Sequence, residues 1–250
     1  MTARSRAFRK RRNLTHPTAA EFRAAKLQRA RFAGVLQAPG AVKYAASLSI
    51  QASVPHSVDR IFVTEEELLL DAYRLGVQIF NSGFRPSFIV GLWRGGSSVG
   101  IAVQECLQHL GVETDHISLR TSYRGMERYQ RMVDEASSEI RVHGTQYLLE
   151  TMNAEDGLLI VDDVYSTGLN VKAVIDRLAS RMRLNLPHDI RIAVPWCKPA
   201  RNRTGRMPDY HLHETDRWLV LPYELNGLSH NELRTHKPFL APLLSKLQGT

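Results

Sequence analysis

Cysteine is scarce in this sequence. The 250 residues include only Cys106 and Cys197, which lie far apart and form no CxxC pair. This scarcity excludes a disulfide framework and a cysteine-based zinc site, and it favours a reducing compartment. Long apolar runs are missing as well, since no stretch reaches the roughly 20 apolar residues that span a bilayer. We therefore expect a cytoplasmic protein without a membrane partner.

Acidic residues are nearly absent from the first 57 residues, which hold eleven Lys or Arg and one acid, Glu21. The rest of the chain has 22 basic and 24 acidic residues, so the formal charge of +8 arises in this N-terminal segment. Four interpretations of the segment stay open: a solvated extension, an organelle transit peptide over residues 1–35, a nucleic-acid- or ribosome-binding tail, and a start codon assigned too far upstream. Nucleic acid is an expected partner only through this segment.

Strand and helix signals alternate from Arg60 onward. Thr64 followed by three glutamates predicts a helix N-cap with acids in the first turn, and Leu68, Ala72 and Leu75 keep helical spacing. The pattern predicts strands at 61–63, 88–92, 113–119, 158–164, 190–194 and 218–221, and helices from 65 past 79, at 99–110 and at 170–181. Such alternation predicts an α/β fold with a mainly parallel sheet covered on both faces, which binds ligands at the carboxyl ends of its strands.

The segment from Leu158 to Gly168 carries the strongest chemical signal. An apolar strand ends in Asp162 and Asp163, a Ser-Thr-Gly turn follows at 166–168, and a helix comes next. The backbone N–H groups of such a turn and the positive end of the helix dipole favour a phosphate. Two carboxylates favour sugar hydroxyls or a divalent cation. The alternative is an ordinary capped junction between a strand and a helix. Walker and GxGxxG loops are absent from the sequence.

This segment resembles the phosphoribosyl diphosphate (PRPP) signature of the type I phosphoribosyltransferases. The resemblance implies that Asp162 and Asp163 hold the ribose hydroxyls and contact Mg²⁺ indirectly, together with PRPP. It implies a 5′-phosphate loop lined by Ser166, Thr167, Gly168 and Asn170. The sequence after an earlier apolar strand resembles the pyrophosphate loop of the same family, formed here by Arg94, Gly95 and Gly96.

Ser122 and Tyr123 lie in a polar stretch that also has a family counterpart. That counterpart is a mobile loop that closes over the reacting centre and excludes water. The alternative for the stretch, residues 120–125, is a solvated basic loop.

The C-terminal part resembles the bacterial xanthine/guanine/hypoxanthine phosphoribosyltransferases. This resemblance implies that Lys198 donates to the 6-oxo group of a purine, which accepts, and discriminates against the amino group of adenine. It implies that Trp218 stacks on the base and that Leu219 supplies backbone contacts. Glu224 matches a position near the 2-substituent of the base or its metal. The resemblance covers about residues 58–230.

Ser166 departs from the family pattern, because the residue before the Thr-Gly of the turn is usually an aspartate that acts at purine N7. Serine is no general base at neutral pH. Three explanations stay open: another carboxylate reaches N7, the substrate ionises easily as xanthine does, or the chain binds nucleotides without efficient turnover. The alternative carboxylates are Asp134, Glu135 and Glu155.

The resemblance implies a type I phosphoribosyltransferase fold over residues 58–235, with a small hood subdomain contributed largely by 195–230. A flexible extension, 1–57, would precede this domain and a tail, 236–250, would follow it. The implied protein is a purine-salvage enzyme, a homodimer or homotetramer, which uses PRPP and Mg²⁺ to convert hypoxanthine, guanine or xanthine to a nucleoside monophosphate. The alternative is a PRPP- or nucleotide-sensing regulator of the same fold. The sequence does not choose among the three bases.

Overall fold

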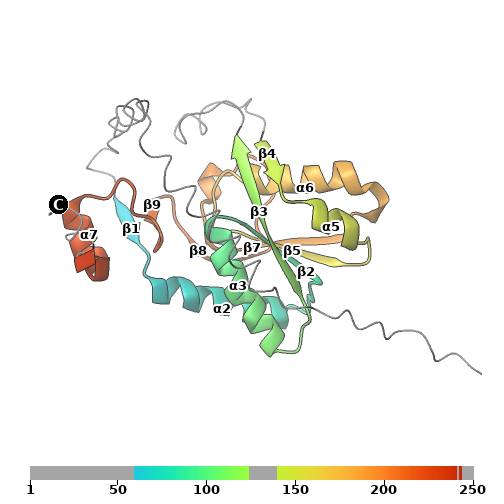
Figure 1. Ribbon diagram of the computed structural model, residues 1–250, viewed down its shortest axis with the longest axis horizontal. Coiled ribbons are helices and arrows are strands. Elements are labelled where there is room, and N and C mark those ends of the chain that lie inside the picture. Colours follow the sequence, from blue (N-terminus) through green and yellow to red (C-terminus); the bar gives the residue numbers. More distant parts are fainter. Residues whose placement is uncertain (1–58, 124–139, 241, 244–250) are drawn as a thin grey trace, which may run out of the picture. The chain divides into compact units, whose positions relative to one another are not determined.

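The computed structural model describes residues 59–123, 140–240 and 242–243. Its main sheet contains β2 (Phe88–Trp93), β3 (Asp115–Tyr123), β4 (Ile140–His143), β5 (Gly157–Val161), β6 (Val164–Tyr165), β7 (Asp189–Cys197) and β8 (Tyr210–Glu214). The order is β4-β3-β2-β5-β7-β6, and β8 pairs with β7 (Figure 1). Every pairing is parallel except that of β3 with β4. The predicted α/β fold with a mainly parallel sheet is confirmed.

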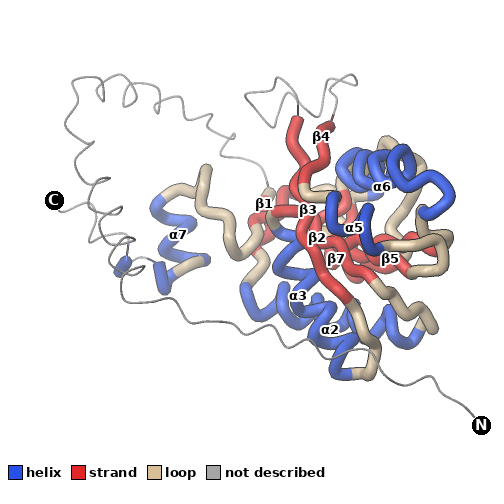
Figure 2. The backbone as a smooth tube through the Cα atoms, turned by 45° about the vertical axis from the view of Figure 1, so that its right-hand side comes forward, coloured by secondary structure: helices blue, strands red, loops and turns tan. Residues whose placement is uncertain are grey.

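Helices cover both faces of this sheet, as Figure 2 shows. They are α2 (Glu65–Asn81), α3 (Gly95–His109), α5 (Gln146–Thr151) and α6 (Leu169–Met182). Side chains alternate along a strand, so Leu159 and Val161 of β5 pack with α2 and α3, whereas Leu158 and Ile160 pack with α5 and α6. None of the helices in the described part of the chain is long and apolar enough to cross a membrane.

The predicted N-cap at Thr64 is confirmed. The Thr64 hydroxyl accepts the N–H of Glu67 at 3.2 Å, and the Glu67 carboxylate accepts the N–H of Thr64 at 2.8 Å. This reciprocal pair is a capping box, which satisfies two backbone donors that a helix start would otherwise leave open.

Two predicted element boundaries are wrong. Helix α3 begins at Gly95 and not near Ser98, because the two glycines form the first helical turn instead of a loop before it. The strand predicted at 158–164 ends at Val161, because the chain turns at the two aspartates and the next residues pair with β7 as β6. The pattern also missed β4, α5 and β8.

A second, two-stranded sheet lies outside the main one. It pairs β1 (Arg60–Phe62) in parallel with β9 (Trp218–Val220), so the last predicted strand lies here. Helix α7 (His230–His236) packs beside it, because the His236 ring stacks on Phe62 with centroids 3.7 Å apart. The segment 195–230, which was predicted to form most of a hood, contributes to both sheets. Its strand β9 belongs to the small sheet and its strand β8 to the main sheet. The predicted start of the C-terminal tail, residue 236, falls inside α7.

Candidate active site

A pocket of about 710 Å³ opens where several strands end. Strand β2 leads into Arg94, β5 into Asp162 and β7 into Lys198, so their carboxyl ends meet at one edge of the sheet. The predicted site residues that line the pocket are Arg94, Gly95, Asp162, Asp163, Ser166, Thr167, Gly168, Asn170, Lys198, Trp218, Leu219 and Glu224. The pocket therefore lies where an open parallel sheet binds its ligands.

The two carboxylates after β5 lie between the neighbouring loops. Asp162 Oδ1 accepts the N–H of Asp163 at 3.0 Å, and Asp163 Oδ1 accepts the N–H of Val164 at 2.8 Å. Burial, and then the adjacent Asp163 carboxylate, raise the pKa of Asp162 well above its ordinary value. Asp162 therefore retains a proton more readily than an exposed aspartate does.

Two glycines bring the start of α3 against this carboxylate pair. A Cβ atom on Gly96 would overlap the Val161 carbonyl and lie 2.8 Å from the Cα atom of Asp162. A Cβ atom on Gly95 would overlap the Asp163 carboxylate. Gly96 is buried beneath the pocket and does not line it. Only residues without a side chain allow the predicted pyrophosphate loop to approach β5 this closely.

Gly168 of the predicted 5′-phosphate loop has a φ of 75° and is the N-cap residue of α6, and Asn170 lies in the first turn of that helix. Such a positive φ is easily adopted only by glycine. The Thr167 hydroxyl accepts the N–H of Leu169 at 3.3 Å, and the Thr167 carbonyl accepts the N–H of Arg203 at 3.0 Å. The loop is thus held in place by the segment that follows β7.

Neither α3 nor α6 has a capping side chain at its start, whereas α2 and α7 have complete capping boxes. The first turn of a helix carries backbone N–H groups with no partner inside the helix, and these groups favour an anion. Helix α5 also lacks a side-chain cap, but of the uncapped starts in the described residues only those of α3 and α6 line the pocket, through Gly95 and Gly168. The pocket therefore offers two anion-binding positions on either side of the carboxylate pair.

Lys198 and the small sheet form the remaining wall. Lys198 is only 5% exposed, and its Nζ donates to the Arg217 carbonyl at 2.5 Å. Burial, and then the nearby Arg201 guanidinium, lower the pKa of Lys198. Trp218 and Leu219 are the first two residues of β9 and line the same wall.

Glu224 and Tyr223 lie on the turn after β9. The Glu224 carboxylate accepts the N–H of Leu221 at 3.2 Å, and burial raises its pKa. The Tyr223 hydroxyl donates to the Asp163 carboxylate. Burial, followed by that carboxylate, raises the pKa of Tyr223. The sequence reasoning missed Tyr223, as it missed Arg201, because no local pattern links either residue to the phosphate loops.

Ser122 does not line the pocket. The structure places Ser122 and Tyr123 on β3, which continues beyond the predicted end because it pairs with β4 from Arg120 onward. Ser122 Oγ lies 2.9 Å from His143 Nε2 on that neighbouring strand, within hydrogen-bond distance. The placement of these two residues on a loop is therefore wrong, and residues 124–139 lie outside the described part.

Of the carboxylates proposed to replace the missing loop aspartate, the structure describes only Glu155, which does not line the pocket. Glu155 lies in the turn before β5, at the amino end of that strand, whereas the pocket lies at the carboxyl end. Asp134 and Glu135 fall outside the described residues. Among the residues that the structure describes, the acids of the pocket wall are Asp162, Asp163 and Glu224.

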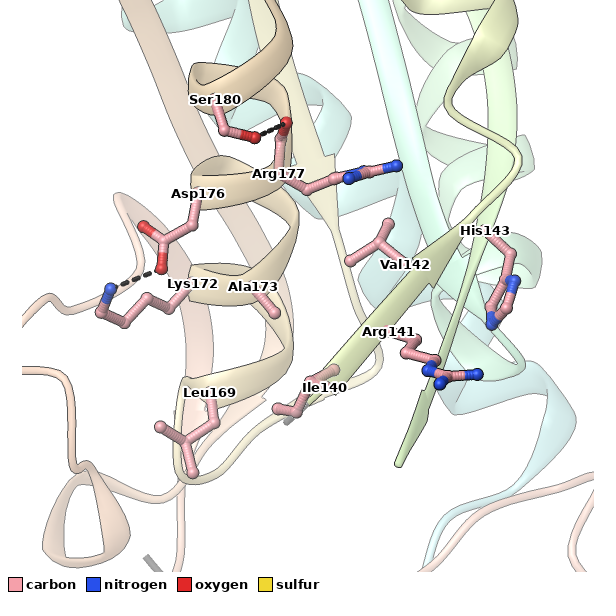
Figure 3. Close-up of a pocket in the computed structure, with 10 residues that line it drawn as sticks. All are labelled: Ile140, Arg141, Val142, His143, Leu169, Lys172, Ala173, Asp176, Arg177 and Ser180. Atoms are coloured by element: carbon pink, nitrogen blue, oxygen red, sulfur yellow. Dashed lines mark hydrogen bonds and ion pairs between the residues drawn. The ribbon is translucent and has the colours of Figure 1, made fainter. Parts of the chain in front are cut away.

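A second hollow, of about 690 Å³, lies between β4 and α6 (Figure 3). Lys172 and Asp176 of α6 form an ion pair at 2.6 Å on its rim, and Arg177 extends from the helix toward β4. Leu169 is common to both hollows, but none of the predicted site residues lines this one. No group of three or more His, Cys, Asp and Glu that could hold a metal occurs in the described ranges.

Comparisons with known proteins agree with this fold. The family model of the phosphoribosyl transferase domain matches residues 62–226. A purine phosphoribosyltransferase from Pyrococcus horikoshii Ot3 is 20% identical with a TM-score of 0.50, over 66% of this chain and 95% of its own. A Neisseria gonorrhoeae hypothetical protein with bound ppGpp is 16% identical with a TM-score of 0.55, over 73% and 96%. No curated protein sequence matches this chain. Because the family match spans more than half of the chain, the protein belongs to the phosphoribosyltransferase family.

Proposed function

We propose that this protein transfers the phosphoribosyl group of PRPP to a 6-oxopurine base, namely hypoxanthine, guanine or xanthine. The products are a nucleoside monophosphate and pyrophosphate, as in purine salvage. One observation carries the proposal: a single pocket joins two uncapped helix starts, a carboxylate pair between them, and a buried lysine beside a tryptophan. Family membership supports a pentosyltransferase that uses PRPP and a base.

PRPP lies across the pocket in this proposal. Its 5′-phosphate accepts hydrogen bonds at the start of α6, from the loop of Ser166, Thr167, Gly168 and Asn170. Its pyrophosphate lies at the start of α3, on Arg94, Gly95 and the backbone of Gly96. Asp162 and Asp163 lie between the two loops, where they accept hydrogen bonds from the ribose hydroxyls.

The residues of the pocket fit Mg²⁺ only when the substrate supplies further oxygen ligands. Mg²⁺ prefers oxygen ligands and is commonly held by one or two carboxylates together with substrate phosphates and water. Asp162 and Asp163 supply such oxygens beside the predicted pyrophosphate position. When bound there, Mg²⁺ would neutralise charge that develops on the departing pyrophosphate.

The reaction breaks the bond between C1′ and the pyrophosphate oxygen, whose electron pair leaves with pyrophosphate. A purine nitrogen then forms the new bond to C1′. The protein acts mainly by positioning the reactants and by stabilising charge. Lys198 donates to the 6-oxo group, Trp218 stacks on the ring, Leu219 contacts the base edge through its backbone, and Glu224 lies near the 2-substituent.

The wall of the pocket also supports a second candidate, a PRPP- or nucleotide-sensing regulator. Ser166 stands where the family usually has an acid, and no carboxylate of the described residues replaces it on that loop. A general acid or base is worth on the order of 10²–10⁴-fold in rate. Turnover separates the two candidates, since a regulator would bind PRPP and release no pyrophosphate.

The test combines a substrate panel with a binding measurement. Purified protein is assayed with Mg²⁺, PRPP and hypoxanthine, guanine, xanthine, adenine, orotate or uracil, and we expect turnover with the three oxopurines alone. Asp162→Asn combined with Asp163→Asn should abolish PRPP binding in calorimetry while the protein stays folded. Asp176→Asn, a change on the exposed face of α6, is the matched control. Unchanged PRPP affinity in the double variant would refute the ribose assignment, and a preference for adenine, orotate or uracil would refute the base assignment.

A further inference from the structure

The Tyr223 hydroxyl is hydrogen-bonded to the carboxylate of Asp163, which the proposed function assigns to the sugar. The hydroxyl donates to Asp163 Oδ2, while Asp163 Oδ1 accepts the N–H of Val164 at 2.8 Å. Both oxygens of Asp163 therefore have a donor in the structure. This contact joins residues 60 positions apart in the sequence, on the turn after β9 and at the end of β5.

Gly95 marks the point at which three elements converge. A Cβ atom on Gly95 would overlap both the Asp163 carboxylate and the Tyr223 hydroxyl. The hydrogen bond thus lies directly against the start of α3, between the two predicted phosphate positions. A sugar bound to both phosphate loops would have to pass through this place.

The Tyr223 hydroxyl and a ribose hydroxyl can form the same kind of hydrogen bond with Asp163. A phenol hydroxyl donates one proton to a carboxylate, and so does a ribose hydroxyl. The turn that carries Tyr223 also carries Glu224, whose carboxylate accepts the N–H of Leu221 within the same turn. Release of Tyr223 from Asp163 would therefore leave the hydrogen bond between Glu224 and Leu221 in place.

We propose that the Tyr223 hydroxyl holds the place of a ribose hydroxyl on Asp163, and that sugar binding exchanges one hydroxyl for the other. The proposal rests on the proposed function, because it requires a ribose at this carboxylate. Tyr223 is then a positioning residue that keeps Asp163 hydrogen-bonded in the ligand-free site. It also lowers the affinity for every ligand that brings a ribose, because the first hydrogen bond must break before the second forms.

The test is Tyr223→Phe, which removes only the hydroxyl of a partly exposed side chain. Calorimetry measures the binding of PRPP with Mg²⁺, of ribose 5-phosphate, and of inorganic pyrophosphate with Mg²⁺. We expect the variant to bind the first two ligands about tenfold more tightly, since a hydrogen bond to a charged group no longer has to be broken. Pyrophosphate carries no ribose, so its affinity should stay within about twofold of the wild type.

A matched control is available at another tyrosine–aspartate pair. The Tyr147 hydroxyl donates to the Asp115 carboxylate, at the amino end of β3, and neither residue lines the pocket. Tyr147→Phe removes the same type of hydrogen bond and should leave all three affinities unchanged.

Three outcomes would overturn the exchange. Unchanged ribose-ligand affinity in Tyr223→Phe would show that the hydroxyl does not compete with the sugar. Weaker affinity would show that Tyr223 contacts the ligand directly. In both cases the PRPP site that the proposed function requires stands, because the wild type binds PRPP. If neither the wild type nor the variant binds PRPP or ribose 5-phosphate, the proposed function fails and the exchange fails with it.

Discussion

Two lysines are buried to nearly the same degree at opposite ends of β9. Lys198 is 5% exposed and Lys237 is 4% exposed. Lys198 Nζ donates to the carbonyl of Arg217, just before the strand. Lys237 Nζ donates to the carbonyls of Leu221 and Pro222, just after it. Both ammonium groups therefore hold the strand that carries Trp218, yet only Lys198 lines the pocket.

The difference between the two lysines lies in their surroundings. An ammonium group has three donors. Within the described residues Lys237 gives two hydrogen bonds to backbone carbonyls, whereas Lys198 gives one and has donors left beside the pocket. Burial of a lysine is costly in either place. Burial and charge therefore do not identify a functional lysine by themselves. The position of the lysine relative to the pocket identifies it.

The largest expected effect is the loss of base use in Lys198→Met. We expect kcat/KM for the oxopurines to fall on the order of 100-fold, because the 6-oxo group loses its donor. PRPP affinity, measured by calorimetry, should change little. Lys172→Met, at an exposed lysine of α6 that pairs with Asp176, is the control and should keep wild-type kinetics. Wild-type kinetics in Lys198→Met would contradict the assignment.

Lys237→Met should produce the larger loss of stability. The substitution removes the Nζ donor from two carbonyls. The Leu221 carbonyl still accepts the N–H of Glu224 at 3.0 Å, whereas the Pro222 carbonyl loses its donor, which costs about 1–3 kcal/mol. We therefore expect the free energy of unfolding, measured in urea, to fall by about 1–3 kcal/mol. Lys198→Met should cost less, because water in the pocket can replace Nζ at the Arg217 carbonyl. Equal losses of unfolding free energy in the two variants would contradict the proposed difference between the two lysines.

Ser166→Asp tests whether a missing carboxylate in the pocket limits turnover. If a missing carboxylate limits turnover beside Lys198, this substitution should raise kcat with hypoxanthine about tenfold. Xanthine ionises more readily and should gain less. A new carboxylate near the 5′-phosphate should also weaken PRPP binding by like-charge repulsion, which calorimetry separates from kcat. A lower kcat at saturating PRPP would indicate that another acid already acts or that Ser166 binds the phosphate.

The smallest expected effect is the pH dependence that Lys198 confers on stability. Because burial lowers its pKa in the folded protein, the unfolded chain binds more protons between that pKa and the ordinary value of 10.5. The contribution of Lys198 to the free energy of unfolding therefore rises with pH across this window. The stability difference between wild type and Lys198→Met should shift in favour of the wild type as pH approaches 10.5. Urea unfolding at a series of pH values measures it, and a flat difference would contradict the prediction.

Local patterns predicted much of the main sheet. The capping box at Thr64 and the apolar strands before Arg94, Asp162 and Lys198 were visible because each depends on residues close in sequence. Helix α7 carries a similar signal, since Ser229 and Glu232 form a capping box at its start. The strand signal of β4 and β8 was too short to separate from loop.

Residues predicted from short motifs lie together in one pocket, whereas contacts between residues distant in sequence were missed. The two loops and the lysine converge in one pocket, as the motifs suggested. Ser122 was misplaced, because a pairing with β4, not the composition of its own segment, decides that it lies on a strand. Tyr223 was missed, because its partner Asp163 lies 60 residues away.

Local features of the sequence were enough to predict an α/β chain with two junctions of strand, turn and helix, because each of these elements depends on residues close in sequence. The tertiary structure sets how these elements combine. It paired β1 with β9 across the chain, brought Gly96 against β5, and set Tyr223 on Asp163. It also gave two equally buried lysines different surroundings, because those surroundings depend on which elements pack around each ammonium group.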